Sequence, residues 1–83
     1  MTDILLSETA RDRLADLEAD VRERIKDALR ELNPGRDLSR LSGEDVYKCR
    51  VGDYRVIADW DRQEENVYVL TVGHRSTVYD RGW

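Results

Sequence analysis

Apolar and polar residues follow two different patterns along this chain, and the pattern changes near residue 45. Between residues 7 and 32 the apolar residues recur three and four positions apart, a spacing that places them on one face of an α-helix. From residue 46 onward the chain is rich in β-branched and aromatic residues, which favour strands. The pattern therefore predicts a helical first half and a strand-rich second half.

The first half predicts one short strand followed by two helices. Residues 3–6 form a short apolar run that suits a strand, and Ser7 directly after it offers a helix N-cap. A second helix start is indicated at Asp20, because Asp20 and Glu23 have the spacing of a capping box. The second helix carries an apolar stripe made by Val21, Ile25, Ala28, Leu29 and Leu32. Pro34 ends this helix, and residues 34–45 are predicted to form a polar connection.

The second half predicts three strands, at about residues 46–51, 54–60 and 67–72. The order β-α-α-β-β-β predicts an α+β fold, with a helical hairpin packed on one face of a largely antiparallel four-stranded sheet. Residues 1–83 are expected to form a single domain, because a chain of this length supports one core.

The turn at Gly52-Asp53 concentrates positive charge on one face of the predicted sheet. A two-residue loop that begins with glycine suits a type II′ hairpin turn. Such a turn places Arg50 directly opposite Arg55, and Lys48 shares their face because strand side chains alternate. Like charges opposite one another destabilise a sheet, so this crowding indicates a surface that holds an anion.

Composition narrows the class of protein. Hydrophobic residues make up 40% of the chain, which is too many for a disordered protein. The single cysteine, Cys49, cannot form an internal disulfide, and alternation places it on the face opposite Lys48 and Arg50, as a buried apolar residue. No apolar run approaches the length needed to cross a bilayer, and no signal peptide is visible, so a cytoplasmic protein is expected.

The acidic residues lie almost wholly in the first half of the chain. Residues 1–45 contain 12 acidic and 8 basic side chains, whereas residues 46–83 contain 6 of each. Lys26 and Lys48 are the only lysines. An acidic surface poor in lysine is compatible either with life in high salt or with an ordinary acidic cytoplasmic protein.

A possible site for a phosphodiester forms where the last predicted strand returns beside the hairpin. If that strand runs antiparallel to its neighbour, Arg75 approaches Arg55, and Tyr79 follows from the C-terminal segment. Guanidinium groups bind phosphate oxygens in pairs and stabilise negative charge that develops during a reaction. His74 is the only histidine; a structural role on the core side is favoured over a role as catalytic acid or base.

These residues also carry a family resemblance. The segments 47–56 and 72–75, followed by Val78 and Tyr79, resemble the RelE family of toxins from toxin–antitoxin systems, and most closely its short archaeal members. The resemblance extends over essentially the whole chain. It implies a type II toxin that acts as a ribosome-dependent mRNA endoribonuclease, or mRNA interferase, and so inhibits translation. The implied partners are a RelB-type antitoxin and the ribosome, where the toxin enters the A site and cuts mRNA.

The resemblance also assigns roles to individual residues, and it implies no cofactor and no metal. Lys48 and Arg50 match the two basic positions of the second strand, which stabilise the scissile phosphate and assist proton transfer. Arg55 and Arg75 match arginines that neutralise phosphate. Tyr79 matches the C-terminal tyrosine, which acts as the base on the 2′-hydroxyl or stacks on the nucleotide.

Two other functions remain open at this point. A ParE-like toxin that inhibits gyrase has the same fold and the same Gly-x-Tyr-Arg element, but has no reason to keep Lys48, Arg50 and Tyr79 together. A catalytically inactive relic that only binds its antitoxin is the second alternative. Crowded arginines weigh against the relic, because they carry a cost in stability.

Overall fold

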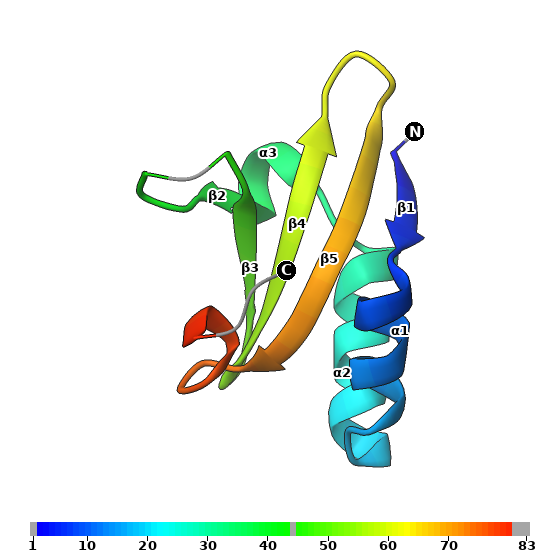
Figure 1. The fold of residues 1–83 in the computed structure, drawn as a ribbon. Helices are drawn as coiled ribbons and strands as arrows, with labels where there is room; N and C mark the ends of the chain where they lie inside the picture. The colour runs from blue at the N-terminus through cyan, green and yellow to red at the C-terminus, as the bar shows by residue number, and fades with distance from the viewer. Residues whose placement is uncertain (1, 44, 81–83) are drawn as a thin grey trace.

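The computed structural model describes residues 2–43 and 45–80, which form one five-stranded sheet with helices packed against it (Figure 1). The elements are β1 (Asp3–Leu6), α1 (Glu8–Ala15), α2 (Ala19–Arg30), α3 (Pro34–Asp37), β2 (Ser39–Arg40), β3 (Tyr47–Val51), β4 (Tyr54–Asp61), β5 (Asn66–His74) and a 3₁₀ helix (Val78–Asp80). The strand order is β1-β5-β4-β3-β2, and β1 pairs with β5 in parallel while the other neighbours are antiparallel. The predicted α+β fold, with a helical hairpin on a largely antiparallel sheet, is confirmed.

The predicted start of the first helix is also confirmed. Ser7 has an extended backbone, and its Oγ accepts a hydrogen bond from the backbone N–H of Ala10 at 3.0 Å. The same hydroxyl donates to the carbonyl oxygen of Leu70 at 2.8 Å. Ser7 therefore caps α1 and joins it to β5, which fixes the end of the helix against the sheet.

Four details of the prediction are wrong. The segment 34–45, predicted as a polar connection, begins with a short helix, α3 (Pro34–Asp37). The sheet has a fifth strand, because Ser39 and Arg40 pair with β3; two paired residues are too few to give an alternation signal. The capping box is absent, because α2 begins at Ala19 and its N-cap, Glu18, forms no side-chain cap. The last strand continues through Gly73 to residue 74 instead of ending at residue 72.

Gly73 continues the strand because a neighbouring side chain occupies the space beside it. A Cβ atom built on Gly73 would lie 3.3 Å from the Cβ of Val78. Val78 is almost fully buried, so the 3₁₀ helix approaches β5 closely at a position where the strand has no side chain. The glycine therefore permits a close contact and does not break the strand.

The core lies between the helices and one face of the sheet. The predicted apolar stripe of α2 contributes Ile25 and Leu29, and α1 contributes Ala10 and Leu14. Cys49 lies in this core with 5% of its surface exposed, as the alternation predicted. Burial is the main cause that raises the pKa of its thiol, and the charge of Asp37 adds to the effect.

The opposite side of the sheet, which we call the open face because neither α1 nor α2 packs on it, carries the side chains that alternate with the core residues. At its centre Ile57 and Thr71 are fully buried, and Val78 of the 3₁₀ helix packs against Gly73 there. Along β4 the open face contains Arg55, Ile57, Asp59 and Asp61, and β3 adds Lys48 and Arg50. α1 and α2 lie together on the other side (Figure 1). No helix within the described residues is long and apolar enough to cross a membrane.

Candidate functional site

The β3–β4 hairpin has the register that its sequence predicted. Val51 pairs with Tyr54, and Arg50 pairs with Arg55. Gly52 has a φ of 59°. In the described part of the chain, Glu65 is the only residue other than glycine that has a positive φ, so Asp53, the second loop residue, does not. A positive φ at the first loop position alone is the pattern of a type II′ turn. The turn thus brings the two arginines directly opposite each other.

Lys48 and Arg50 present free positive charge on the open face. Lys48 is half-buried and Arg50 is exposed. Neither side chain forms a salt bridge with a carboxylate in residues 2–43 or 45–80. Two unneutralised cations on neighbouring positions of one strand face provide the electrostatic part of a phosphate site.

Arg55 occupies the same face but its guanidinium turns back onto the hairpin. Only 7% of its surface is exposed. Its Nη1 donates hydrogen bonds to the carbonyl oxygens of Gly52 at 3.0 Å and of Tyr54 at 2.8 Å. The like charges of Arg50 and Arg55 therefore diverge, one toward solvent and one toward the turn, which lowers the cost of placing them opposite each other.

Arg75 is held beside the same turn by its backbone. Its N–H donates to the carbonyl oxygen of Asp53 at 2.8 Å, and its Nε lies 3.8 Å from a carboxylate oxygen of Asp53. The side chain remains 61% exposed, so the contact with Asp53 is a weak surface ion pair. Arg75 therefore stands at the hairpin end of the sheet, as predicted, with its guanidinium accessible.

His74 and Tyr79 take different positions around this end. The ring of His74 packs edge-on against Tyr54, with 5.4 Å between ring centroids. Its Nδ1 accepts a hydrogen bond from the N–H of Ser76 at 3.1 Å, so a neutral ring carries its proton on Nε2. This geometry fits the structural role expected for His74. Tyr79 is 40% exposed in the 3₁₀ helix that follows.

One basic residue near the turn was missed by the sequence analysis. The guanidinium of Arg24, from the middle of α2, lies beside Gly52: a Cβ atom built on that glycine would be 2.7 Å from Arg24 Nη2. Arg24 sits within a run of charged helical residues, where its contact with a loop 28 positions later leaves no local signal. The hairpin end of the molecule therefore gathers cations from strand β3, helix α2 and the segment after β5. We call Lys48, Arg50, Arg75 and Arg24 the basic end.

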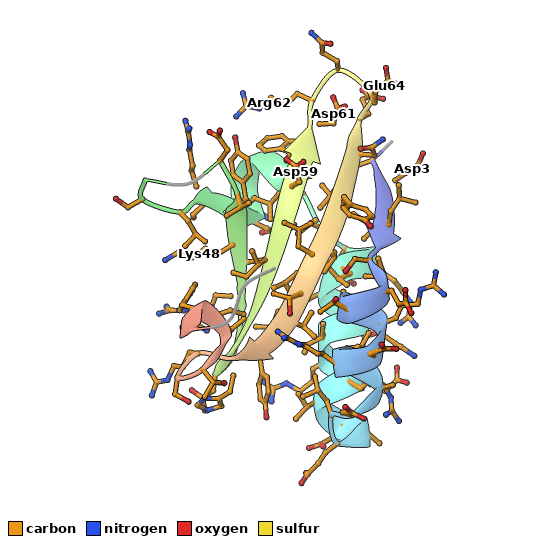
Figure 2. The ribbon with its side chains drawn as sticks, viewed as in Figure 1. Asp3, Lys48, Asp59, Asp61, Arg62 and Glu64 are labelled. Carbon is orange, nitrogen blue, oxygen red and sulfur yellow. The ribbon has the colours of Figure 1, made fainter. Side chains whose placement is uncertain are left out.

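The open face carries the opposite charge at its other end. Asp59 and Asp61 follow Ile57 along β4 on this face, and Asp3 lies at the same level on β1. Figure 2 shows these three aspartates near the end of the sheet that leads into the β4–β5 turn, with Lys48 farther along β3. Alternation in the segment 57–61 was the signal that could have located this acidic end.

The basic end can bind and stabilise an anion with several negative oxygens. Two cations on one strand face, Lys48 and Arg50, together with Arg75 beside the hairpin turn, match the charge of a phosphodiester better than that of a single carboxylate. The exposed phenol of Tyr79 is a candidate for proton transfer in the sequence-predicted set. Within the described residues, no group of three or more His, Cys, Asp and Glu side chains is arranged to hold a metal ion.

Comparisons with known proteins identify relatives of the whole chain. A family model described as the ParE toxin of the type II toxin–antitoxin system parDE matches residues 4–79. The toxin–antitoxin complex RelBE2 from Mycobacterium tuberculosis contains a chain with 27% identity and a TM-score of 0.77, and the match covers 89% of this chain and 98% of that one. The RelB–RelE complex from Methanococcus jannaschii gives 26% identity, a TM-score of 0.72, and coverage of 92% and 95%.

A mutant of the Escherichia coli toxin RelE in the free state shares the same fold. Its TM-score is 0.76 at 24% identity, and the match covers 94% of this chain and 87% of that one. A search of curated protein sequences found no match.

Proposed function

The chain belongs to the ParE toxin family of type II toxin–antitoxin systems, within the RelE/ParE superfamily, and from that premise we propose that it is a ribosome-dependent mRNA endoribonuclease. The observation that carries this proposal is the basic end of the open face. Lys48 and Arg50 lie on one strand without a salt bridge in the described part of the chain, and Arg75 stands beside them at the hairpin. Cations that are left without carboxylate partners at adjacent positions lower stability unless they bind an anion.

The proposed reaction is an intramolecular transesterification at one phosphodiester of the messenger. The base, Tyr79 in its phenolate form, accepts the proton of a ribose 2′-hydroxyl and becomes a neutral phenol, and the 2′-oxygen attacks the adjacent phosphorus. The bond from phosphorus to the 5′-oxygen of the next nucleotide breaks, which leaves a 2′,3′-cyclic phosphate and a 5′-hydroxyl. Lys48 supplies the proton to the leaving 5′-oxygen. Arg50 and Arg75 stabilise the charge on the non-bridging oxygens.

Arg55 has a supporting part in this proposal. Its guanidinium holds the carbonyl groups of the hairpin turn and adds a positive charge beneath the binding surface. The hairpin turn also positions Arg50, and the carbonyl oxygen of Asp53 in the turn holds the backbone N–H of Arg75. We therefore assign Arg55 to positioning and electrostatics, and leave contact with the phosphate to the exposed cations.

The proposed partner that neutralises the toxin is an antitoxin of the RelB type. Both similar structures from M. tuberculosis and M. jannaschii are toxin–antitoxin complexes. On the helix side of this chain an apolar groove offers a surface for such a partner, and its rim carries Lys26 and Arg30. The groove is lined by Ile4, Leu6, Leu14, Leu29 and Leu32. Leu32→Glu is expected to weaken antitoxin binding, measured by calorimetry, while messenger cleavage is retained.

A gyrase-inhibiting activity is the second candidate, because the matching family model carries the ParE name. The two functions are separated by one set of reactions. The protein is added to a cell-free translation system and messenger ends are mapped by primer extension; in parallel it is added to DNA gyrase and supercoiling is followed. Arg75→Ala and, as a matched control on α1, Arg11→Ala are tested with it.

The proposal predicts that the messenger is cut within codons and only when ribosomes are present. The cuts should disappear with Arg75→Ala and persist with Arg11→Ala. Intact messenger together with loss of supercoiling would replace the ribonuclease with a gyrase inhibitor. A folded protein that affects neither reaction would identify an inactive antitoxin-binding relic.

A further inference from the structure

We propose that Arg24 of helix α2 binds a second phosphate of the RNA, distinct from the scissile one, and so holds the substrate without taking part in the reaction. The inference rests on the proposed function, which places RNA at the hairpin end of the open face. It extends that binding surface around the edge of β3 onto the helix side of the molecule.

Arg24 is held beside the hairpin turn by the packing of α2. The next residue, Ile25, is fully buried in the core, which anchors this turn of the helix against the sheet. The guanidinium of Arg24 lies across Gly52: a Cβ atom built on that glycine would be 2.7 Å from Nη2, 3.6 Å from Cζ and 4.0 Å from Nη1. Gly52 leaves room for this close approach because it has no side chain. The positive charge of Arg24 is therefore positioned at the turn.

This charge has no partner on α2, although carboxylates are available there. Asp20 lies four residues before Arg24 and Asp27 three residues after it, the spacings at which opposite charges pair on a helix. Asp27 pairs with Arg30 instead. Within the described part of the chain, Arg24 is exposed and forms no hydrogen bond or ion pair with any residue. Its guanidinium is therefore available to an anion from outside the chain.

Arg24 and Arg50 border one path around the edge of the sheet. The short strand β2 pairs with β3 at residues 47 and 48, so the hairpin end of β3 lies beyond it and faces α2. Arg50 and Ala28 line the same cleft at this edge. Ala28 lies one helical turn after Arg24, on the same face of α2. The helix therefore continues the row of cations that begins on the open face.

The charges along this cleft favour its hairpin end for an anion. At the other end, Arg36 is neutralised by Asp37, with Nε 2.8 Å from Oδ1 and Nη2 3.0 Å from Oδ2. Glu31 adds a further negative charge to that part of the cleft. Toward the hairpin, neither Arg50 nor Arg24 forms a salt bridge within the described residues. A polyanion that leaves the open face at Arg50 is therefore attracted toward Arg24 and not toward α3.

The ligand at Arg24 is a phosphate of an RNA strand. Gly52 lies two residues after Arg50, a distance of about 7 Å along a strand, which is roughly two nucleotide rises of 3.4 Å. The phosphate at Arg24 therefore belongs to the messenger, one or two nucleotides from the scissile bond, or to ribosomal RNA beside it. In both cases it does not react, so Arg24 binds the ground state and the transition state equally. Its loss should raise KM and leave kcat unchanged.

The experiment measures binding, so that its result does not depend on cleavage. One probe is a short RNA oligonucleotide with 2′-O-methyl groups, which cannot be cut because the attacking hydroxyl is blocked. The other probe is ribosomes without messenger, with an empty A site. The affinities of the parent chain, Arg24→Ala and Arg30→Ala are measured over a range of salt concentrations. Arg30→Ala is the matched control, because it removes the same charge from the same helix about 9 Å farther along its axis.

Arg24→Ala should weaken binding about tenfold, the effect of losing one hydrogen bond to a charged group. It should also reduce the slope of log K against log[salt] by about 0.7–0.9, the contribution of one phosphate. Arg30→Ala should leave the slope unchanged. A loss with the oligonucleotide assigns the phosphate to the messenger, and a loss with the ribosomes alone assigns it to ribosomal RNA.

Three results would overturn the inference. The first is a parent chain that binds neither probe. The second is Arg24→Ala with the affinity and slope of the parent for both probes. The third is a loss of affinity without a change in slope, which would show that Arg24 only supports the fold.

The same measurements separate this inference from the proposed function. A parent chain that cuts messenger, while Arg24→Ala binds both probes as the parent does, refutes the role of Arg24 alone. A parent chain whose RNA binding loses one phosphate contact with Arg24→Ala, but which leaves messenger intact on the ribosome, refutes the nuclease alone.

Discussion

Replacing Arg55 tests whether its guanidinium supports the hairpin or contacts the substrate. Arg55→Met keeps an unbranched apolar stem and removes both hydrogen bonds to the carbonyl oxygens of Gly52 and Tyr54. A hydrogen bond from a charged donor contributes about 1.5–3 kcal/mol when it is buried, and partial access of water to the turn reduces this. We expect a net loss of about 2 kcal/mol in the free energy of unfolding.

The loss is large enough to measure by thermal and urea denaturation followed by circular dichroism. For a domain of this length, about 2 kcal/mol lowers the melting temperature by roughly 8–16 °C. The matched control, Arg11→Met on the exposed face of α1, is expected to change stability by less than about 0.5 kcal/mol. A melting temperature of Arg55→Met within about 2 °C of the parent chain, combined with lost messenger cleavage, would refute this reasoning and show that Arg55 acts on the substrate.

Three further substitutions or conditions test the fold around the site. Ser7→Ala removes the cap of α1 and its link to β5, and should lower the free energy of unfolding by about 1–2 kcal/mol in urea denaturation; an unchanged midpoint would contradict the cap. Gly52→Ala introduces strain at positive φ and displaces Arg24, so it should cost about 1–2 kcal/mol, whereas Gly35→Ala should not. Burial raises the pKa of the Cys49 thiol in the folded state. The neutral thiol therefore contributes its full stability below the thiol pKa of the unfolded chain, and this stability is lost as the pH rises through the thiol pKa of the folded protein. Below that pH, alkylation of Cys49 should be much slower in the folded protein than in a denatured control.

The sequence predicted those parts of the fold that depend on local geometry. The loop Gly52-Asp53 determined the register of β3 against β4, because its length and its glycine fit one type of turn. Ser7 located the start of α1, because its side chain caps a helix within three residues. The apolar stripe of α2 identified the residues that enter the core.

The parts that could not be predicted depend on contacts between distant segments. The short strand β2 has only two paired residues, so its sequence carries no period. The inward turn of Arg55 results from two carbonyl groups of the turn, and the position of Arg24 results from how α2 lies across the sheet. The residue types were visible in the sequence in each case, but the pairing of β2 and the directions of the two arginine side chains were decided by tertiary packing.

We propose above that the basic end of the open face cuts messenger RNA on the ribosome. The most direct measurement is the single-turnover rate of cleavage of a defined mRNA in a programmed ribosome complex, for the parent chain, Lys48→Met and the control Arg11→Met. We predict cleavage in the A-site codon by the parent and the control, and a rate at least about 100-fold lower for Lys48→Met, the size expected when a proton donor is removed. Cleavage by Lys48→Met at the parent rate would contradict the role of Lys48, and intact messenger with folded parent protein would contradict the nuclease itself.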